Sequence, residues 1–585
     1  MKHTISFEIR EGADVQQEGT FWVPSGCISL SLTVGLEKVY RSLVFLVLID
    51  PEGTIRLQKQ LANGEPVIAI GQDGTDTTIG GVPGSIPEGE WTARICLFAE
   101  YLGKLQGHTA TMDLMVTDEK AAITENIGAQ LWTNGRLEYG QFDYDRVYRG
   151  NAQRSDVGTD AENSLQGGVL ENENPAMNSD ADKSVLCGGS DEPGRRWYKG
   201  DFHTHTRLSD GKETTANATR KAEQDGLDFY VPTEHNVVHT GWQATDLLIL
   251  PGVEATTILG HTNLFGLTRR PAALDAILYH KGEAELAQDI EALILECRQN
   301  GWLFSVNHPF LHIWKWLYRD LKLADMDCLE INNDPTYAAD PEGGAEEANR
   351  KAVRLSDLLW ADGYRICAIG GSDSHNLRDE FYPGADEPSV PGDPATWVFM
   401  DSLTPRHLLA ALKECQVYVT RHCGVTARFT ADGREVRFGD ELPEGTRRLA
   451  CELRLQDCRE EPVIFYLLDG ERHVCESSKA EDGTYVVRTE IMLQTKTGDA
   501  DNRDNGKNVA EDGSPNTGAA ARDYHWIRFG AETTDGGLML YANPLTIGHR
   551  DGHAFRTFGE VRDYLEEHWT ADRKGESADD QGNPV

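Results

Sequence analysis

Histidines and carboxylates in the middle of the chain have the residue types and the spacing of metal ligands. His203 and His205 lie two residues apart in GDFHTHTRLSDG, so on a strand both imidazoles would project from one face and could hold one cation. The other candidate ligands are Asp210, His235, Glu254, His261, His308, Asp373 and His375. Such nitrogen and oxygen donors bind divalent cations, and the absence of cysteine among them favours Zn, Mn or Fe.

The number of these residues predicts more than one ion. A single histidine at the end of a strand is more often a hydrogen-bonded structural residue than a ligand. Here five expected strand ends carry such residues, in VPTEHN, LPGVEATT, LFSVNHP and AIGGSDSH as well as in the first motif. The set exceeds the roughly four ligands that one zinc ion takes, so two or three divalent ions are expected.

Repeated helix–glycine–strand units would position these residues. TTANATRKAEQDG has a threonine cap, helical spacing and a terminal glycine, and the strand LDFYVPTEHN follows it. LAQDIEALILECRQNG precedes WLFSVNHP, and GAEEANRKAVRLSDLLWADG precedes YRICAIGGSDSH. This alternation over residues 198–425 predicts an α/β domain with parallel strands, in a barrel or a doubly wound sheet, whose carboxyl ends gather on one face.

Strand-rich segments are expected on both sides of this region. Residues 1–135 contain short β-branched and aliphatic runs separated by turn residues, which predicts a β-sandwich. Residues 136–197 are polar and acidic and are predicted to be a disordered linker. A C-terminal β domain is expected over residues 426–550, with a disordered insert at 496–523, and a short helix and polar tail over 551–585.

The overall composition excludes several classes of protein. The 585 residues carry a formal net charge of −39, which argues against binding to long nucleic-acid tracts or to anionic membranes. No apolar run approaches the roughly 20 residues that span a bilayer, the first residues lack a secretory signal, and the 11 cysteines are dispersed. The chain is therefore expected to be soluble, cytoplasmic and multidomain.

The ordered series HxH, Asp, His, Glu, His, His and DxH resembles that of the PHP (polymerase and histidinol phosphatase) superfamily of metal-dependent hydrolases, over about residues 198–425. The flanks WYKGDFHTHT, PGDPATWVFMDSLTPRHLLAALKECQVYVT and YHWIRFG…LMLYANPLTIG are similar to the CehA/McbA-like branch. The resemblance implies a distorted (β/α)7 barrel flanked by N-terminal and C-terminal all-β domains.

The resemblance also implies how the ligands are shared. His203, His205, Glu254 and Asp373 would hold one metal, Glu254 would bridge to a second ion held by His261 and His308, and Asp210, His235 and His375 would hold a third. Glu234 stands where the family more usually has aspartate, and we expect it to orient a ligand rather than to bind metal. Loss of one ligand would leave a two-metal site.

The implied reaction is hydrolysis of an ester, most broadly of a phosphoester. Divalent ions lower the pKa of bound water toward about 7, so the expected nucleophile is a metal-bridging hydroxide. Asp373 would orient it or take its proton, with His203 and Glu254 as further catalytic residues. The chain has no GxSxG motif, no P-loop and no GxGxxG after a strand. Two alternatives stay open: hydrolysis of a carboxylic or carbamate ester, and a non-catalytic binding protein stabilised by metal.

Five basic residues are candidates for binding an anionic small-molecule ester or phosphoester: Arg207, Lys212, His312, Arg421 and His422. Each of them fits a solvated or packing role equally well. The β-rich flanks are compatible with substrate selection, with packing against the barrel, or with formation of a homo-oligomer.

Overall fold

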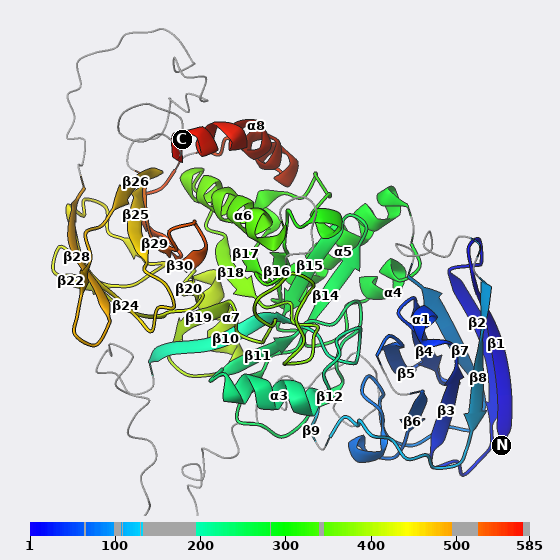
Figure 1. Ribbon diagram of the computed structural model, residues 1–585. Coiled ribbons are helices and arrows are strands. Elements are labelled where there is room, and N and C mark those ends of the chain that lie inside the picture. Colours follow the sequence, from blue (N-terminus) through cyan, green and yellow to red (C-terminus); the bar gives the residue numbers. More distant parts are fainter. Residues whose placement is uncertain are drawn as a thin grey trace, which may run out of the picture.

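The computed structural model describes residues 1–63, 66–98, 107, 109–128, 130–132, 195–280, 282–337, 344–493, 524–550 and 552–576. Residues 136–194 of the predicted linker and the whole predicted insert, 496–523, lie outside this part of the chain. The described residues form a strand-rich mixed α/β structure. Figure 1 shows the N-terminal strands on one side of a central region that carries most of the helices, and the C-terminal strands on the other side. No helix of the described residues is long and apolar enough to cross a membrane.

The N-terminal region consists of two four-stranded sheets, with the strand orders β1-β8-β3-β6 and β2-β7-β4-β5. In the first sheet β1 is Lys2–Arg10, β8 is Thr109–Thr117, β3 is Leu30–Gly35 and β6 is Val67–Ile70. In the second, β2 is Gln16–Val23, β7 is Gly89–Leu97, β4 is Val44–Ile49 and β5 is Ile55–Gln60. Buried residues of both sheets, such as Phe7, Leu32, Leu46 and Trp91, share one core, which is how two half-buried sheets stabilise each other.

Two sheets make up the central region. One contains β10 (Arg196–Thr204), β11 (Phe229–Pro232), β13 (Leu248–Ile249), β19 (Ala395–Met400) and β20 (Val417–Thr420). The other has the order β14-β15-β16-β17-β18: Gly252–Thr257, Gly260–Phe265, Leu303–Val306, Cys328–Asn333 and Cys367–Gly371. A short pair, β9 (Gln130–Leu131) with β12 (Gly241–Trp242), lies beside them.

The repeated units predicted parallel strands, but the strands of the second central sheet are not all parallel. β16, β17 and β18 run parallel to one another, but β15 is antiparallel to both β14 and β16. The reason is the connection between β14 and β15, a tight turn that ends at Gly260 with φ of 115°. A parallel crossover needs about a dozen residues, whereas a turn reverses the chain.

The C-terminal strands extend the first central sheet. β30 (Leu538–Ala542) pairs with β20, and the sheet continues through β29 (His525–Glu532) to β25 (Val463–Leu468) and β26 (Glu471–Val474), with β31 (Leu545–Ile547) and β23 (Glu441–Leu442) beside β29. The first central sheet therefore contains strands from both sides of residue 425.

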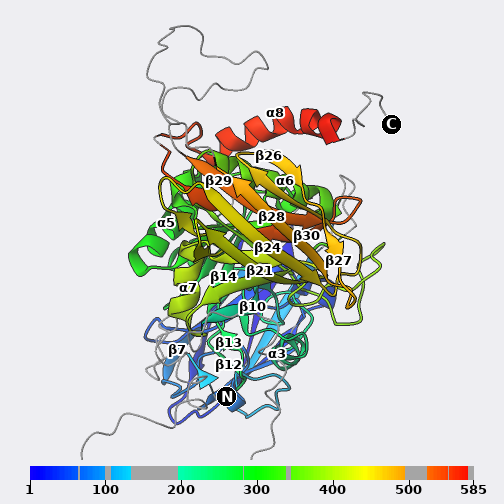
Figure 2. The same cartoon turned by 90° about the vertical axis from the view of Figure 1, so that its left-hand side faces the viewer.

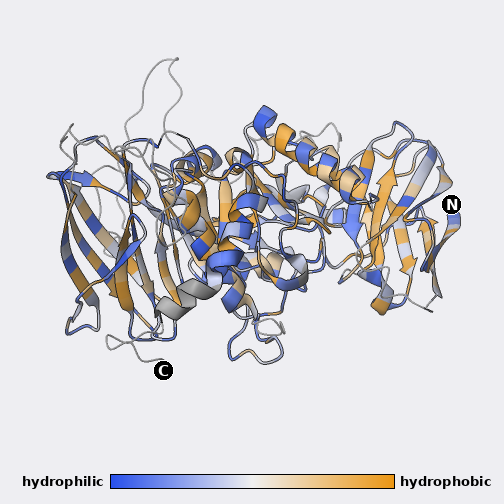
Figure 3. Ribbon diagram, turned by 90° about the horizontal axis from the view of Figure 1, so that it is seen from above, coloured by the Kyte–Doolittle hydropathy of each residue, from blue (hydrophilic) through white to orange (hydrophobic). Residues whose placement is uncertain are grey.

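A further five-stranded sheet forms the outer C-terminal layer. It has the order β22-β21-β24-β28-β27, with bounds Arg434–Val436, Gly424–Ala431, Arg448–Gln456, Tyr485–Met492 and Ser478–Lys479. Figure 2 shows β21, β24 and β28 across the front of the molecule. Buried and exposed residues alternate along β24, and hydrophobic and hydrophilic residues alternate along the outer strands in Figure 3. This sheet therefore has one covered and one solvated face.

The described helices are α1 (Lys38–Arg41), α3 (Thr215–Gln224), α4 (Ala273–Ile277), α5 (Glu283–Asn300), α6 (Gly344–Ala361), α7 (Pro405–Lys413) and α8 (Phe558–Glu576), with short 3₁₀ turns η1 (Gly74–Asp76), η3 (His312–Trp314) and η4 (Leu323–Asp325). Thr214 caps α3, because its hydroxyl accepts from the Asn217 amide. Gly301, with φ of 73°, ends α5 in the left-handed conformation.

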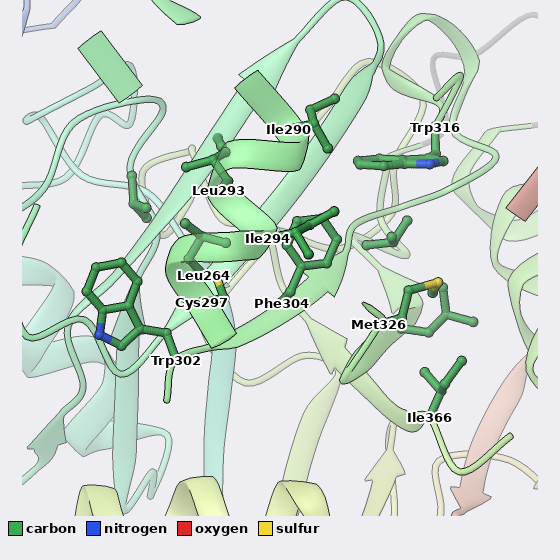
Figure 4. Close-up of a cluster of buried hydrophobic side chains, with 14 of the residues drawn as sticks. Leu264, Ile290, Leu293, Ile294, Cys297, Trp302, Phe304, Trp316, Met326 and Ile366 are labelled. Atoms are coloured by element: carbon green, nitrogen blue, oxygen red, sulfur yellow. The ribbon is translucent and has the colours of Figure 1, made fainter. Parts of the chain in front are cut away.

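The central core lies between α5 and the second central sheet. Leu293, Ile294 and Cys297 point from one face of α5 toward Leu264 and Phe304 of the strands (Figure 4). Their spacing of three and four residues places them on one side of the helix. This packing fixes the sheet whose edge carries the candidate metal ligands.

Candidate metal centre

All nine candidate ligands come together in the structure. They make up overlapping groups whose ligand atoms lie within 4.8 Å of one another: His205, Asp210, His235 and His375; His203, His205 and Glu254; His203, His308 and Asp373; and His235, Glu254 and His261. Within these groups His308 lies with His203 and Asp373, and His235 lies with Glu254 and His261, while His308 Nε2 is also 3.3 Å from Glu254 Oε1. The shared members make this a single centre.

The ends of the central strands position these side chains. His203 is the penultimate residue of β10, and His205 follows that strand directly. Isolated bridges join Thr204 to Ser374 and His235 to Glu254, so the edges of the two central sheets meet at the centre. Their meeting brings together residues that are far apart in the sequence.

His261 reaches the centre by a different route from the one that parallel strands predict. It is the second residue of β15 and lies opposite Thr256 of β14. Because β15 runs antiparallel to β14, its first residues lie beside the last residues of β14. His261 and Glu254 therefore face the same edge, with His261 Nδ1 3.1 Å from Glu254 Oε1.

Glu254 lies in the middle of the centre and is fully buried. Histidine nitrogens surround its two oxygens: Oε1 is 3.3 Å from His203 Nε2, 3.1 Å from His261 Nδ1 and 3.3 Å from His308 Nε2, and Oε2 is 2.7 Å from His235 Nδ1 and 3.6 Å from His205 Nε2. Asn307 Nδ2 also donates to Oε1, at 3.0 Å. One carboxylate with neighbours on both oxygens has the position of a bridging ligand.

Burial and neighbouring charges give the histidines different pKa values. Burial alone would lower the pKa of His203, but the surrounding carboxylates raise it well above its ordinary value. Burial and two adjacent imidazoles lower the pKa of His205 to about 4. The histidines hold the pKa values of Glu254 and Asp373 well below the ordinary range against the effect of burial. Both carboxylates are therefore ionised at neutral pH.

Buried polar atoms at the centre have no hydrogen-bond partner of normal geometry among the described residues. They are His203 Nε2, His205 Nδ1 and Nε2, Asp210 Oδ1, Glu254 Oε2, His308 Nδ1 and Asp373 Oδ1. Buried polar atoms are nearly always paired, so a cluster of such atoms indicates a ligand. Imidazole nitrogens and carboxylate oxygens facing one another are the donor set for Zn, Mn or Fe. The residues thus fit the divalent ions that the sequence motifs imply.

Glu330 is a further residue of the centre that the sequence motifs do not include. Its Oε1 lies 3.0 Å from His203 Nδ1, and its Oε2 accepts from the His308 amide at 2.9 Å and from Asn333 Nδ2 at 3.1 Å. Beside a carboxylate, Nδ1 of His203 carries a proton, so Nε2 is the nitrogen that would supply a lone pair to an ion that displaces the second proton. The signal that the sequence offers is an acidic residue in the middle of the segment CLEINN. In the structure Glu330 is only 2% exposed.

Glu234 is buried and belongs to none of the four groups. The backbone amides of Thr206 and Ser209 donate to it at 3.0 and 3.2 Å, and His239 Nε2 lies 2.8 Å from it. Burial opposes ionisation, but His239 first, and then His205 and the Ser209 hydroxyl, lower the pKa of Glu234 to about 2. This carboxylate therefore holds the loop that leads to Asp210.

Two of the five basic candidates lie in a separate ion-pair network. Arg421 pairs with Glu387 and with Asp393, the latter at 3.1 Å. His422 Nε2 lies 3.3 Å from Glu387 and 3.5 Å from Asp393. The possible ligand atoms of Glu387, Asp393 and His422 also lie close enough together to hold a cation. The guanidinium of Arg421 already pairs with both carboxylates, and that of Arg459 pairs with Glu387 as well.

The other three basic candidates have contacts of their own. Lys212 pairs with Glu380 and donates to Asn376 at 2.8 Å. Arg207 Nε donates to the Lys212 carbonyl at 2.9 Å. His312 begins the short turn η3, is half-buried and has a positive φ of 34°. Lys212 therefore offers a substrate less charge than its sequence position suggests.

Comparisons with known proteins found solved structures to which this chain is similar. A two-domain protein from Bacteroides vulgatus, described as containing a predicted PHP-like metal-dependent phosphoesterase, is 16% identical, with a TM-score of 0.30 over 61% of this chain and 97% of that one. A putative metal-dependent phosphoesterase from Bifidobacterium adolescentis is 15% identical, with a TM-score of 0.23 over 32% and 91%. An amidohydrolase from Chromobacterium violaceum, with bound sulfate and no metal, is 13% identical, with a TM-score of 0.21 over 36% and 96%.

No family model matches the chain, and no curated protein matches it.

Proposed function

We propose that this protein is a PHP-type metal-dependent hydrolase that cleaves an ester of a small molecule, with a phosphoester as the first candidate. The supporting observation is the convergence of nine imidazole and carboxylate side chains, six of which carry buried polar atoms without a hydrogen-bond partner among the described residues. A closed structural zinc site uses about four ligands, and this larger set suits two or three ions. Bound divalent ions lower the pKa of a water ligand and polarise an ester oxygen.

After Asp210, Asp373 has the most exposed side chain among the candidate carboxylate ligands, so a substrate can reach it. Its side chain is 15% exposed, whereas that of Glu254 is 1% exposed. Oδ1 of Asp373 lies 2.9 Å from His205 Nε2 and 3.3 Å from His203 Nε2. Because Asp373 is ionised at neutral pH, it orients the attacking water by accepting a hydrogen bond. Glu254 and His203 hold the surrounding ligands in place.

We also propose that the two central sheets form the distorted (β/α)7 barrel that the family resemblance implies. The bridges Thr204–Ser374 and His235–Glu254 support it, because they join the sheets at two separate places. In this arrangement the centre lies at the carboxyl ends of the parallel strands, where barrel enzymes carry their active sites.

Hydrolysis of a carboxylic or carbamate ester is the second candidate function. The observation that favours it is the pairing of Arg421 and Lys212 with carboxylates. A doubly charged phosphate monoester needs cations to offset its charge, whereas a neutral ester does not. The metal ions would serve both reactions equally.

One preparation tests these functions. The protein is loaded with Zn, Mn or Fe, its bound metal is counted, and it is assayed on bis-p-nitrophenyl phosphate, p-nitrophenyl phosphate and 1-naphthyl methylcarbamate. We expect at least two metal equivalents and turnover of a phosphoester. Turnover of the carbamate alone would select the second candidate.

Asp373→Asn is the matched variant, because it keeps the shape of the side chain and removes the charge. Asp432→Asn, in a turn of the outer C-terminal sheet, is the control for the same chemical change at a distance. We expect the first to lose activity and the second to keep it. Failure of the metal-loaded protein on a broader panel of esters would reject hydrolysis.

A further inference from the structure

The loop between β10 and α3 carries Asp210 and contacts the N-terminal β region. Asp210 belongs to the group with His205, His235 and His375, with its Oδ1 3.5 Å from His235 Nε2 and 3.3 Å from His375 Nε2. No helix or strand includes residues 205–214. The position of the Asp210 carboxylate therefore depends on what holds this loop.

Asn63 of the N-terminal region holds the loop directly beside Asp210. Its side-chain amide donates to the Asp210 carbonyl at 2.5 Å and to the Gly211 carbonyl at 3.3 Å. Asn63 is half-buried and follows β5 by three residues. Both bonds join positions about 150 residues apart in the sequence, so only the packing of the two regions creates them.

Strand β5 itself makes two more bonds to the loop. The Gln60 amide donates to the Leu208 carbonyl at 3.1 Å, and the Lys59 ammonium donates to the Arg207 carbonyl. β5 is the last strand of its sheet, and Figure 1 shows it on the side of the N-terminal region that faces the central strands. The outer edge of this sheet, which bridges to Gly81 at Leu57, therefore also binds the loop.

Apolar packing strengthens the same contact. Leu208 is fully buried in a cluster with Phe45, Ile79 and Phe98 of the N-terminal region and Val237 of the central region. Burying a leucine side chain stabilises a contact by about 2 kcal/mol. On the inner side, the bonds to Glu234 described above fix the start of the loop, so the loop is held from both sides.

We propose that Asn63 is a positioning residue for the metal centre and that the N-terminal β region is thereby a structural part of it. Asn63 and β5 set the place of the Asp210 carboxylate, and so the affinity of the group His205, Asp210, His235 and His375 for its ion. Asn63 contacts none of these four side chains in the hydrogen bonds described, and it acts through the backbone of the loop. The inference rests on the proposed metal-dependent function.

The test is the isosteric variant Asn63→Asp in the full chain. A carboxylate oxygen would face the Asp210 carbonyl oxygen at the position of the lost donor, and the repulsion would displace the loop. Partners that orient metal ligands usually contribute about 10- to 100-fold to affinity. We expect one Zn²⁺ equivalent to bind about 10- to 100-fold more weakly, measured by competition with a chromophoric chelator, and the remaining equivalents to bind as in the wild type.

Asn126→Asp is the matched control, because Asn126 is also half-buried in the N-terminal region and its Oδ1 accepts from the Gly128 amide at 3.0 Å. The carboxylate of that variant keeps this bond, so Zn²⁺ binding should not change. Asp210→Asn is the benchmark, and Asn63→Asp should weaken the same equivalent. Asn63→Ala, which removes the donor without adding charge, serves if Asn63→Asp does not fold.

The outcomes separate this inference from the proposed function. Wild-type protein that binds no Zn²⁺ would reject both. Wild-type protein that binds Zn²⁺, with folded Asn63 variants that bind it identically, would reject the positioning role alone. Equal weakening of every equivalent would also reject it, because the geometry assigns Asn63 to one group.

Discussion

Replacing Glu330 with glutamine should weaken metal binding although Glu330 is not a candidate ligand. Its Oε1 faces Nδ1 of His203, and its Oε2 accepts from the His308 amide and from Asn333 Nδ2. A glutamine has the same shape but only one acceptor oxygen. If that oxygen points toward His203, the NH2 group of the glutamine faces two other donors, the His308 amide and Asn333 Nδ2. Turned toward the His308 amide, it leaves the amide group facing Nδ1 of His203.

The second orientation changes the tautomer of His203. Nδ1 must then accept a hydrogen bond, so the proton moves to Nε2, the nitrogen that faces Glu254 and Asp373. A protonated Nε2 cannot bind a cation. Loss of a carboxylate that orients a ligating histidine usually costs about 10- to 100-fold in metal affinity, or about 1.4 to 2.7 kcal/mol. We expect Glu330→Gln to fall in this range.

The assay is competition between the protein and a chelator for Zn²⁺, with thermal unfolding as the check of folding. Asp357→Asn is the matched control, since it is another buried carboxylate, bonded to Arg528 at 2.7 Å and not part of the four ligand groups. That variant should lose stability and keep its Zn²⁺ affinity. Unchanged Zn²⁺ affinity in folded Glu330→Gln would refute the reasoning about the His203 tautomer.

Three further predictions concern stability. Removal of divalent ions by a chelator should lower the unfolding temperature, because the ions bind the folded chain; an unchanged temperature in calorimetry would contradict this. Burial lowers the pKa of Lys59 to about 8 from 10.5, so between these pH values the folded chain has lost a proton that the unfolded chain keeps. The stability of the wild type relative to Lys59→Met should therefore rise by up to about 3 kcal/mol over this interval, as thermal unfolding at pH 7.5 and 10 would show. Leu293→Ala, at a fully buried position of α5, should cost about 2 to 5 kcal/mol and lower the unfolding temperature. Leu295→Ala on the same helix, where the side chain is 54% exposed, should change it little.

The sequence by itself determined the ligand types and several local elements. The two-residue spacing of His203 and His205 and the strand-end positions of the other candidates led to nine residues, all of which lie in the groups at the centre. The ends of α3 and α5 were also predictable, because a threonine cap and a left-handed glycine act within a few residues of themselves. These features depend only on residues that are close together in the sequence.

Tertiary structure alone decided how these parts meet. The reversal of β15 places His261 beside Glu254, and β30 joins β20 across more than 100 residues. The contacts of Glu330 with His203 and of Asn63 with Asp210 span 127 and 147 residues. No spacing rule connects such positions, because they become neighbours only when separate strands pair and separate regions pack. The candidate ligands could thus be predicted from the sequence. The tertiary structure determines which of them lie in the same group and which other residues hold them in position.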